Sequence, residues 1–191
     1  MEPLPILTIG YGQRSPSELL ALMRDQGIAF IIDVRSNPVS KFQPDFSRPV
    51  LEPFLKTSGI QYVFMGDTLG GRPSDPTCYS EGHVVYDAVR EREFFKTGIN
   101  RLQHASDGGH RICLLCAERK PEDCHRSKLI GVALQQLRYG VLHIDANNTL
   151  VSNDQVLARL EVPQGSLFPK GLKSRKAYRS AQTEGPDANV P

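Results

Sequence analysis

The most reactive group of residues in this chain lies between Cys116 and Arg126, where the sequence reads Cys-Ala-Glu-Arg-Lys-Pro-Glu-Asp-Cys-His-Arg. An apolar run precedes this segment and a helical pattern follows it, which predicts Cys124 in the first helical turn with Asp123 as the N-cap. Unpaired backbone N–H groups and the helix dipole favour a thiolate there, and Arg126 acts in the same direction. Cys124 is therefore predicted to be nucleophilic near neutral pH.

Three interpretations of this segment remain open. In the first, Cys124 is a catalytic nucleophile and His125 or Glu118 moves protons. In the second, Cys116 and Cys124 bind zinc or form a reversible disulfide. A four-ligand zinc site that also includes Cys113 and His125 is weakened because Cys113 lies three residues from Cys116 on one strand and points to the opposite face, while a site of Cys116, Cys124 and one distant His remains open. In the third, the cysteines only pack, and this interpretation is preferred for Cys113.

Arginines near the predicted strand ends indicate an anion site. Arg126 and the helix start can hold a phosphate or a carboxylate. Asp33 and Arg35 face the same side of a strand, where they either bind a ligand or pair with each other. Arg72 follows Gly-Gly, which suits a loop that closes over a ligand as well as a plain turn. The residues predicted to contact substrate are Tyr11, Arg35, Ser36, Arg72 and Arg126.

The elements that must position these residues alternate between strands and helices. Strands are expected at 6–9, 28–34, 60–65, 111–116 and 141–144. Helices are expected at 16–27, 49–58, 124–139 and 153–160, and 84–104 is expected to form one or two helices. This order predicts a three-layer, Rossmann-like α/β fold with a mostly parallel five-stranded sheet and helices on both faces. Ligands bind beyond the carboxyl ends of such strands, where the longer connections 35–46 and 66–82 gather. The site is therefore expected at that edge.

Composition limits the class of protein. The chain has 191 residues, of which 39% are hydrophobic and 23% charged, with a net charge of +2, as in a globular protein with one domain at 1–162. No apolar run approaches the roughly 20 residues of a membrane span, and the start lacks a secretory signal, so a cytoplasmic protein is expected. Four cysteines in a reducing compartment do not indicate a disulfide framework. Ordinary nucleotide hydrolysis and dinucleotide redox chemistry lack their glycine-rich motifs.

The last segment, 163–191, has a different character. It holds seven Gly or Pro residues and five basic residues against Glu184 and Asp187, and it is predicted to be a disordered tail when free. Residues 164–168 resemble the peptide with which many bacterial replication and repair proteins dock on the sliding clamp; a chance match is the alternative. Leu167 and Phe168 would fill an apolar pocket and Gln164 would bond at its rim. The basic residues that follow favour phosphate backbones, or serve only as solubilising charge.

Four motifs stand in order at the predicted strand ends. They are Thr8-Ile9-Gly10-Tyr11, Asp33-Val34-Arg35-Ser36-Asn37-Pro38, Leu69-Gly70-Gly71-Arg72, and Cys116-Ala117-Glu118 through Cys124-His125-Arg126. Over about residues 6–145, this series resembles the small bacterial and archaeal proteins of the YeaO-like family, known as domain of unknown function 488. The resemblance implies a shared site on an α/β sheet and no particular reaction. Tyr11 stands where many relatives have His, which weighs against proton transfer at that position.

Together these observations predict an enzyme of nucleic-acid or nucleotide metabolism, in DNA repair or modification. The predicted catalytic residues are Cys124, His125, Glu118 and Asp33. One alternative is a thiol redox or zinc-binding protein that uses Cys116 and Cys124, and zinc is the one cofactor that the residues suggest. The other is a non-catalytic nucleic-acid-binding module that the tail recruits to the sliding clamp.

Overall fold

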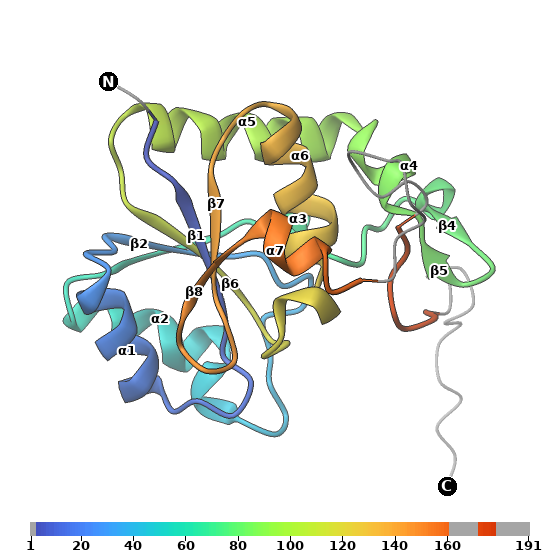
Figure 1. The fold of residues 1–191 in the computed structure, drawn as a ribbon. Coiled ribbons are helices and arrows are strands. Elements are labelled where there is room, and N and C mark those ends of the chain that lie inside the picture. Colours follow the sequence, from blue (N-terminus) through green and yellow to red (C-terminus); the bar gives the residue numbers. More distant parts are fainter. Residues whose placement is uncertain (1–2, 161–171, 179–191) are drawn as a thin grey trace, which may run out of the picture.

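A single mixed sheet organises the computed structural model, which describes residues 3–160 and 172–178 (Figure 1). Its strand order is β3-β2-β6-β1-β7-β8, and all neighbours are parallel except β7 and β8. The strands are β1 (Ile6–Gly10), β2 (Phe30–Asp33), β3 (Gln61–Phe64), β6 (Ile112–Cys116), β7 (Val141–Ile144) and β8 (Leu150–Ser152). The predicted α/β fold is confirmed. The unexpected sixth strand, β8, is only three residues long and forms an antiparallel hairpin with β7, too short to give a periodic signal.

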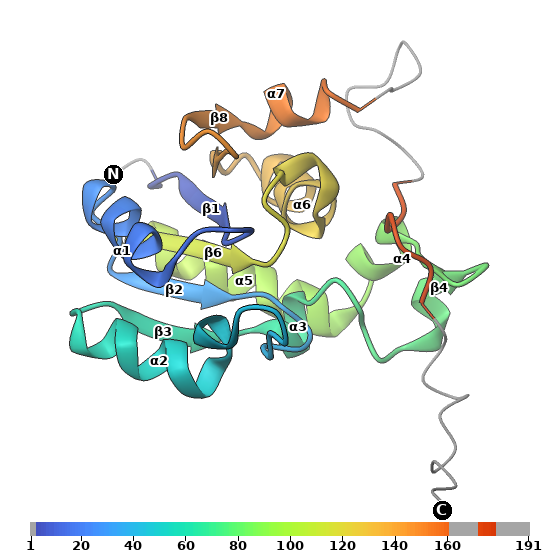
Figure 2. The same cartoon turned by 90° about the horizontal axis from the view of Figure 1, so that it is seen from below.

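Helices cover both faces of the sheet, as Figure 2 shows from below. Helices α1 (Pro16–Asp25) and α2 (Arg48–Thr57) pack on one face. The other face is covered by α3 (Gly66–Leu69), α4 (Tyr86–Arg90), α5 (Glu93–Asp107) and α6 (Val132–Gln136), and α7 (Asn153–Leu157) follows β8. Within the described ranges, no helix combines the length and the apolar character that crossing a membrane requires.

Local sequence signals fix the first strand–helix–strand unit. All five residues of β1 are buried. The predicted capping box at the start of α1 is present, because the Ser15 hydroxyl accepts from the Glu18 N–H and the Glu18 carboxylate accepts from the Ser15 N–H. After α1 the chain turns at Gly27, whose φ of 63° lies in the left-handed region that glycine tolerates. The chain then enters β2 beside β6.

Strand β6 separates two cysteines as its pleat predicts. Cys113 packs in the core formed with α1 and α2, whereas Cys116 faces the opposite core. All four cysteines of the chain are free. The prediction that Cys113 and Cys116 point to opposite faces of the strand is therefore confirmed.

The chain after β6 departs from the prediction of one helix over 124–139. Residues Pro121–Asp123 form a separate 3₁₀ turn, and Cys124 is extended, with φ −116° and ψ 153°. Helical structure then runs as the π-helix η4 (Arg126–Gly131) followed by α6. Asp123 is therefore not the N-cap: Pro121 starts its own turn, and the Cys124 sulfur accepts the Arg126 N–H at 3.5 Å. Such π-helical segments are frequent at functional sites.

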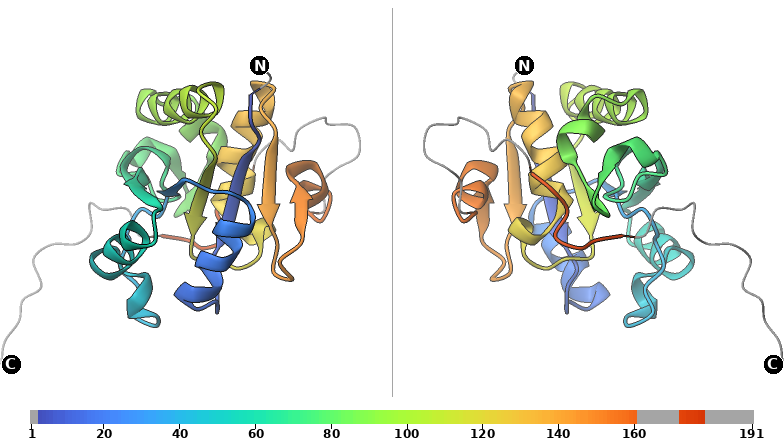
Figure 3. Two further views of the ribbon diagram at one scale, coloured as in Figure 1. Left: turned by 90° about the vertical axis from the view of Figure 1, so that its left-hand side faces the viewer. Right: turned by 90° about the vertical axis from the view of Figure 1, so that its right-hand side faces the viewer.

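Part of the predicted tail is packed against the domain. Residues 172–178, which we name the strap and which are red in Figure 3, lie against α4 and the hairpin of β4 (Tyr79–Ser80) and β5 (His83–Val84). The Ser174 N–H donates to the Val84 carbonyl at 2.9 Å, and the Tyr86 N–H donates to the Leu172 carbonyl at 3.0 Å. These residues are thus packed in this structure, because their backbone groups find partners beside β5. Sequence composition gave no sign of that pairing.

Candidate functional site

A pocket of about 370 Å³ opens at the carboxyl ends of the central strands. Its floor comes from the residues that follow β1, β2 and β6, and its rim from the loop after α3 and from the strap. This is the edge at which ligands bind in parallel sheets. Of the predicted site residues, those that line the pocket are Tyr11, Arg35, Ser36, Arg72, Cys116, Glu118, Cys124 and His125.

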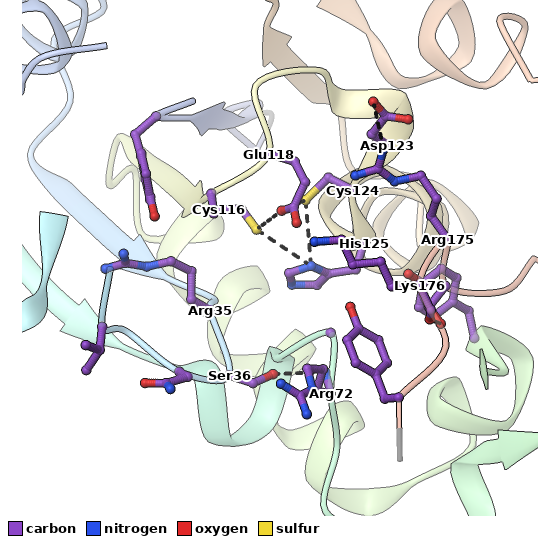
Figure 4. A pocket seen from close by; sticks show the side chains of 18 residues that line it. Arg35, Ser36, Arg72, Cys116, Glu118, Asp123, Cys124, His125, Arg175 and Lys176 are labelled. Atoms are coloured by element: carbon purple, nitrogen blue, oxygen red, sulfur yellow. Dashed lines mark hydrogen bonds and ion pairs between the residues drawn. The ribbon is translucent and has the colours of Figure 1, made fainter. Parts of the chain in front are cut away.

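Four side chains converge at the floor of the pocket, and we refer to them as the thiol cluster: Cys116, Glu118, Cys124 and His125 (Figure 4). The His125 Nδ1 atom lies 3.8 Å from the Cys116 sulfur and 3.7 Å from the Cys124 sulfur. The Glu118 Oε2 atom lies 3.0 Å and 3.5 Å from the same two sulfurs. Two thiols therefore share one ring nitrogen and one carboxylate oxygen. The histidine that joins the cysteines is His125, the sequence neighbour of Cys124.

The imidazole of His125 is held by its surroundings. Its Nε2 atom lies 3.1 Å from the Val34 carbonyl oxygen, so Nε2 carries the proton and Nδ1 faces the sulfurs. A Cβ atom at Gly71 would lie 2.8 Å from the ring, closer than real side chains pack. The second glycine of the Leu-Gly-Gly motif therefore gives the ring its space, a role that the sequence alone did not reveal.

Burial and neighbouring charges separate the two thiols. Burial raises the pKa of Cys124, but contacts with Cys116, His125 and Arg126 outweigh it and bring this pKa well below its usual range. Contact with Cys124 and burial raise the pKa of Cys116. Burial lowers the pKa of His125, but the Cys124 charge more than compensates and the net shift is upward. The negative charge of the pair therefore resides on Cys124.

Arg126 holds the loop that carries Glu118 in place. Its fully buried guanidinium donates to the Glu118 carbonyl at 2.6 Å and to the Arg119 carbonyl at 3.0 Å. A Cβ at Gly10 would lie 1.7 Å from that Glu118 oxygen, so only glycine fits at this position of the first motif. Although Arg126 was expected to touch substrate, it does not line the pocket. It instead fixes the loop that carries Glu118.

Asp33 and Arg35 form a buried pair. The Arg35 Nη2 atom lies 2.5 Å from the Asp33 Oδ2 atom, and Nη1 donates to the Phe46 carbonyl at 2.8 Å. The Tyr62 hydroxyl donates to Asp33 at 2.6 Å. Burial lowers the pKa of Arg35, but Asp33 reverses this and the net shift is upward. Of the two interpretations made from the sequence, pairing describes Asp33, which does not line the pocket. Arg35 also lines the pocket, beside the Tyr11 ring.

The strap completes the rim with residues that sequence analysis did not assign to a site. The Arg72 guanidinium lies 4.4 Å from the centre of the Tyr178 ring, and the Arg72 N–H donates to the Ser36 hydroxyl at 2.9 Å. Arg175 and Lys176 line the pocket as well. The lining residues that sequence analysis did not assign to the site include Tyr86 of α4 and, in the strap, Ser174, Arg175, Lys176 and Tyr178. The one signal in the sequence that could have indicated these residues was Tyr178, an aromatic residue within the basic run of the tail.

The proposed docking peptide cannot be placed in this geometry. Gln164, Leu167 and Phe168 lie outside the described residues. Its prediction rests on the sequence alone.

Comparison with known proteins gives one result. A family described as "Domain of unknown function DUF488" matches residues 15–133, which include the thiol cluster, Asp33, Arg35 and Arg72. No curated protein and no solved structure matches the chain. The match covers more than half of the 191 residues and includes three of the four motifs at the strand ends. The chain therefore belongs to the DUF488 family.

Proposed function

We propose that this protein is an enzyme of nucleic-acid or nucleotide metabolism that binds a phosphate-bearing substrate in the pocket and converts it at the thiol cluster. The observation that carries the proposal is the juxtaposition of two thiols, an imidazole and a carboxyl group beneath a rim of cationic side chains. Reactive groups with convergent polar neighbours in a pocket are the usual mark of an active site.

The charge of the pocket favours an anionic substrate. Arg72, Arg175 and Lys176 lie at its rim, and Arg35 adds a guanidinium whose charge Asp33 balances. The acidic lining residues are Glu118 and Asp123, and the carboxylate of Asp123 lies 4.0 Å from Arg175. Arginine forks match the geometry of phosphate oxygens. The cationic rim is therefore suited to a phosphate group.

Aromatic lining residues narrow the substrate class. The rings of Tyr11, Tyr86 and Tyr178 border the same pocket as the cations. Proteins hold nucleotides by combining phosphate contacts with contacts to aromatic rings. A nucleotide, or the end of a nucleic-acid strand, presents both groups, and DNA repair or modification is the setting that we favour.

Within the cluster, Glu118 is the proton carrier. Its Oε2 atom touches both sulfurs, and its backbone carbonyl is fixed by Arg126. A carboxylate at hydrogen-bond distance from an acidic hydrogen can accept the proton and return it. Conversion of substrate is thus expected to depend on the Glu118 carboxylate as well as on Cys124.

The test is incubation of the purified chain with deoxynucleoside monophosphates and with 5′-phosphorylated oligonucleotides, single-stranded and duplex, followed by mass spectrometry. We expect at least one probe to be converted, and its dephosphorylated form to react poorly. Glu118→Gln should lose conversion, whereas the matched variant Glu52→Gln, on the exposed face of α2, should retain it. Equal treatment of phosphorylated and dephosphorylated probes contradicts the proposal.

One observation favours a second candidate, a thiol redox protein. The sulfurs of Cys116 and Cys124 lie within 4.8 Å of each other, so a modest shift allows a reversible disulfide. Mild oxidation would then remove two hydrogens from the intact mass and leave neither thiol open to alkylation. Retention of both thiols under such oxidation eliminates this candidate.

Recruitment to the sliding clamp is a separate proposal on the partner. Residues 164–168 would dock, and the chain on either side would act as a tether. A pull-down with the clamp should capture the intact chain and lose the double variant Leu167→Ala, Phe168→Ala. Failure of the intact chain to bind ends the idea without affecting the enzymatic proposal.

A further inference from the structure

We propose that Cys116, Cys124 and His125 bind one zinc ion and leave its fourth coordination position open to the pocket. The ion's catalytic placement rests on the proposed function, whereas its binding does not. Among the described residues, the ligand atoms of these three all lie within 4.8 Å of one another.

The spacing of the three ligand atoms fits tetrahedral coordination. Zinc bonds of about 2.3 Å to sulfur and about 2.0–2.1 Å to nitrogen, at tetrahedral angles, place a sulfur about 3.6 Å from a nitrogen and about 3.8 Å from a second sulfur. The Nδ1 atom of His125 lies 3.8 Å from the Cys116 sulfur and 3.7 Å from the Cys124 sulfur. The two sulfur–nitrogen distances therefore match a tetrahedral zinc site, and the two sulfurs lie within 4.8 Å of each other.

The orientation of the His125 imidazole also supports zinc binding. Because the Nε2 atom of His125 faces the Val34 carbonyl at 3.1 Å, the Nδ1 lone pair points at both sulfurs. A backbone carbonyl that fixes the far ring nitrogen is the usual outer support of a zinc-binding histidine. Without an ion, two sulfurs face this single ring nitrogen. An ion between them satisfies all three atoms at once.

The surroundings support thiolate ligands and give an ion access. The Arg126 N–H donates to the Cys124 sulfur at 3.5 Å, and the positive guanidinium of the same residue is buried behind the loop. Cys116, Cys124 and His125 are only 3%, 2% and 7% exposed, yet all three line the pocket. An ion therefore has a route to the site and a substrate has a route to the ion.

The number of ligands indicates the kind of site. Structural zinc sites have four protein ligands, whereas catalytic sites have three and keep one position free. Cys113 cannot be the fourth ligand because it packs on the other face of the sheet. Glu118, with its Oε2 atom 3.0 Å from the Cys116 sulfur, stands beside the site and is placed to exchange protons with a group bound there.

The test begins with elemental analysis of untagged protein purified without chelator, which should give one zinc per chain. Removal of zinc by a chelator and titration with Co²⁺ should then produce the intense absorption of a tetrahedral Co²⁺ site with thiolate charge-transfer bands. Cys124→Ser and His125→Ala should lose the metal, while Cys113→Ala should keep it. Because the cobalt spectrum is measured on the unaltered chain, it does not depend on the folding of any variant.

The outcomes for metal and for catalysis are separable. Zinc far below one per chain together with no tetrahedral cobalt spectrum overturns the zinc site, even if phosphate-bearing probes are converted. Zinc retained by both Cys124→Ser and His125→Ala overturns it as well. Stoichiometric zinc without conversion of any phosphate-bearing probe supports the site and removes the proposed function. Glu118→Gln should bind zinc as the unaltered chain does while losing conversion.

Discussion

Two buried histidines in this molecule have opposite surroundings. The Nδ1 atom of His143 lies 2.6 Å from the Thr8 hydroxyl and its Nε2 atom lies 2.8 Å from the Asn153 side-chain oxygen, so both nitrogens have partners. Burial lowers the pKa of His143 to about 4. His125 has one nitrogen bound to the backbone and the other shared between two sulfurs at a pocket wall. The first holds β1, β7 and α7 together, and the second is left open to a ligand.

The same contrast separates two acid groups, Asp33 and Glu118. Asp33 uses its oxygens on Arg35 and Tyr62, whereas the Glu118 oxygen that touches two thiols also borders the pocket. Buried polar groups with complete sets of protein partners stabilise a fold. Groups that converge on one another beside a cavity have capacity left for a substrate or an ion. Burial and residue type alone do not distinguish the two classes.

The largest effect on activity should come from a substitution in the thiol cluster. Cys124→Ser should reduce conversion of the substrate found among the phosphate-bearing probes by about 10³-fold or more, because sulfur is required either as nucleophile or as ligand. The melting temperature should change little. The measurement is turnover beside a thermal melt, with Cys113→Ala as the control. Wild-type turnover in the Ser variant would remove the thiol from the mechanism.

Substitutions at buried groups whose partners are all within the protein should instead lower the stability of the fold. Asp33→Ala strands the buried Arg35 guanidinium and should lower the free energy of unfolding by about 3–5 kcal/mol in urea titrations. Glu52→Ala, which breaks the exposed pair with Arg48, should cost about 0.5 kcal/mol or less. If the Asp33 variant stays stable but loses activity, the catalytic role predicted from its sequence position is correct.

The burial of His143 should make the stability of the fold depend on pH. His143 stays neutral in the folded chain down to a pKa of about 4, whereas the unfolded chain takes up the proton near 6.5. Its stabilising contribution is therefore complete above pH 6.5 and declines by about 3 kcal/mol as the pH falls to about 4. Urea unfolding across this range should show a steeper decline for the unaltered chain than for His143→Gln. Identical slopes would show that His143 titrates normally.

The space around His125 offers a finer test. Gly71→Ala places a Cβ about 2.8 Å from the imidazole and should tilt the ring away from the sulfurs. Metal affinity or turnover should fall about 10–100-fold, as for other supporting positions. The matched variant is Gly140→Ala, whose added Cβ would meet its nearest neighbour at an ordinary 3.5 Å. Equal behaviour of the two variants would mean that ring orientation does not limit the site.

The smallest effect is expected at the rim. Arg72→Ala removes a guanidinium from the pocket and from the Tyr178 ring, and should weaken nucleotide binding about tenfold. Equilibrium dialysis with a labelled deoxynucleoside monophosphate measures this directly. Arg24→Ala, in the last turn of α1, should bind like the unaltered chain. Unchanged binding in the Arg72 variant would place the phosphate elsewhere.

Local patterns in the chain predicted most of the scaffold. The capping box at Ser15, the continuously apolar strands and the opposite faces of Cys113 and Cys116 all follow from residues within a few positions of one another. The carboxyl edge of the sheet was predicted for the same reason, since alternation of strands and helices fixes where loops gather. Short β8 was missed because three residues carry no period.

The sequence by itself thus determined the α/β architecture, the family and the segment that bears the reactive side chains. Only the tertiary structure decided that His125 faces both sulfurs, that Arg126 turns away to hold the Glu118 carbonyl, and that the strap closes the rim. These features depend on contacts between residues far apart in the chain, such as Val34 with His125 and Gly71 with the same ring. No local propensity encodes such contacts, because they exist only once the sheet brings its loops to one edge.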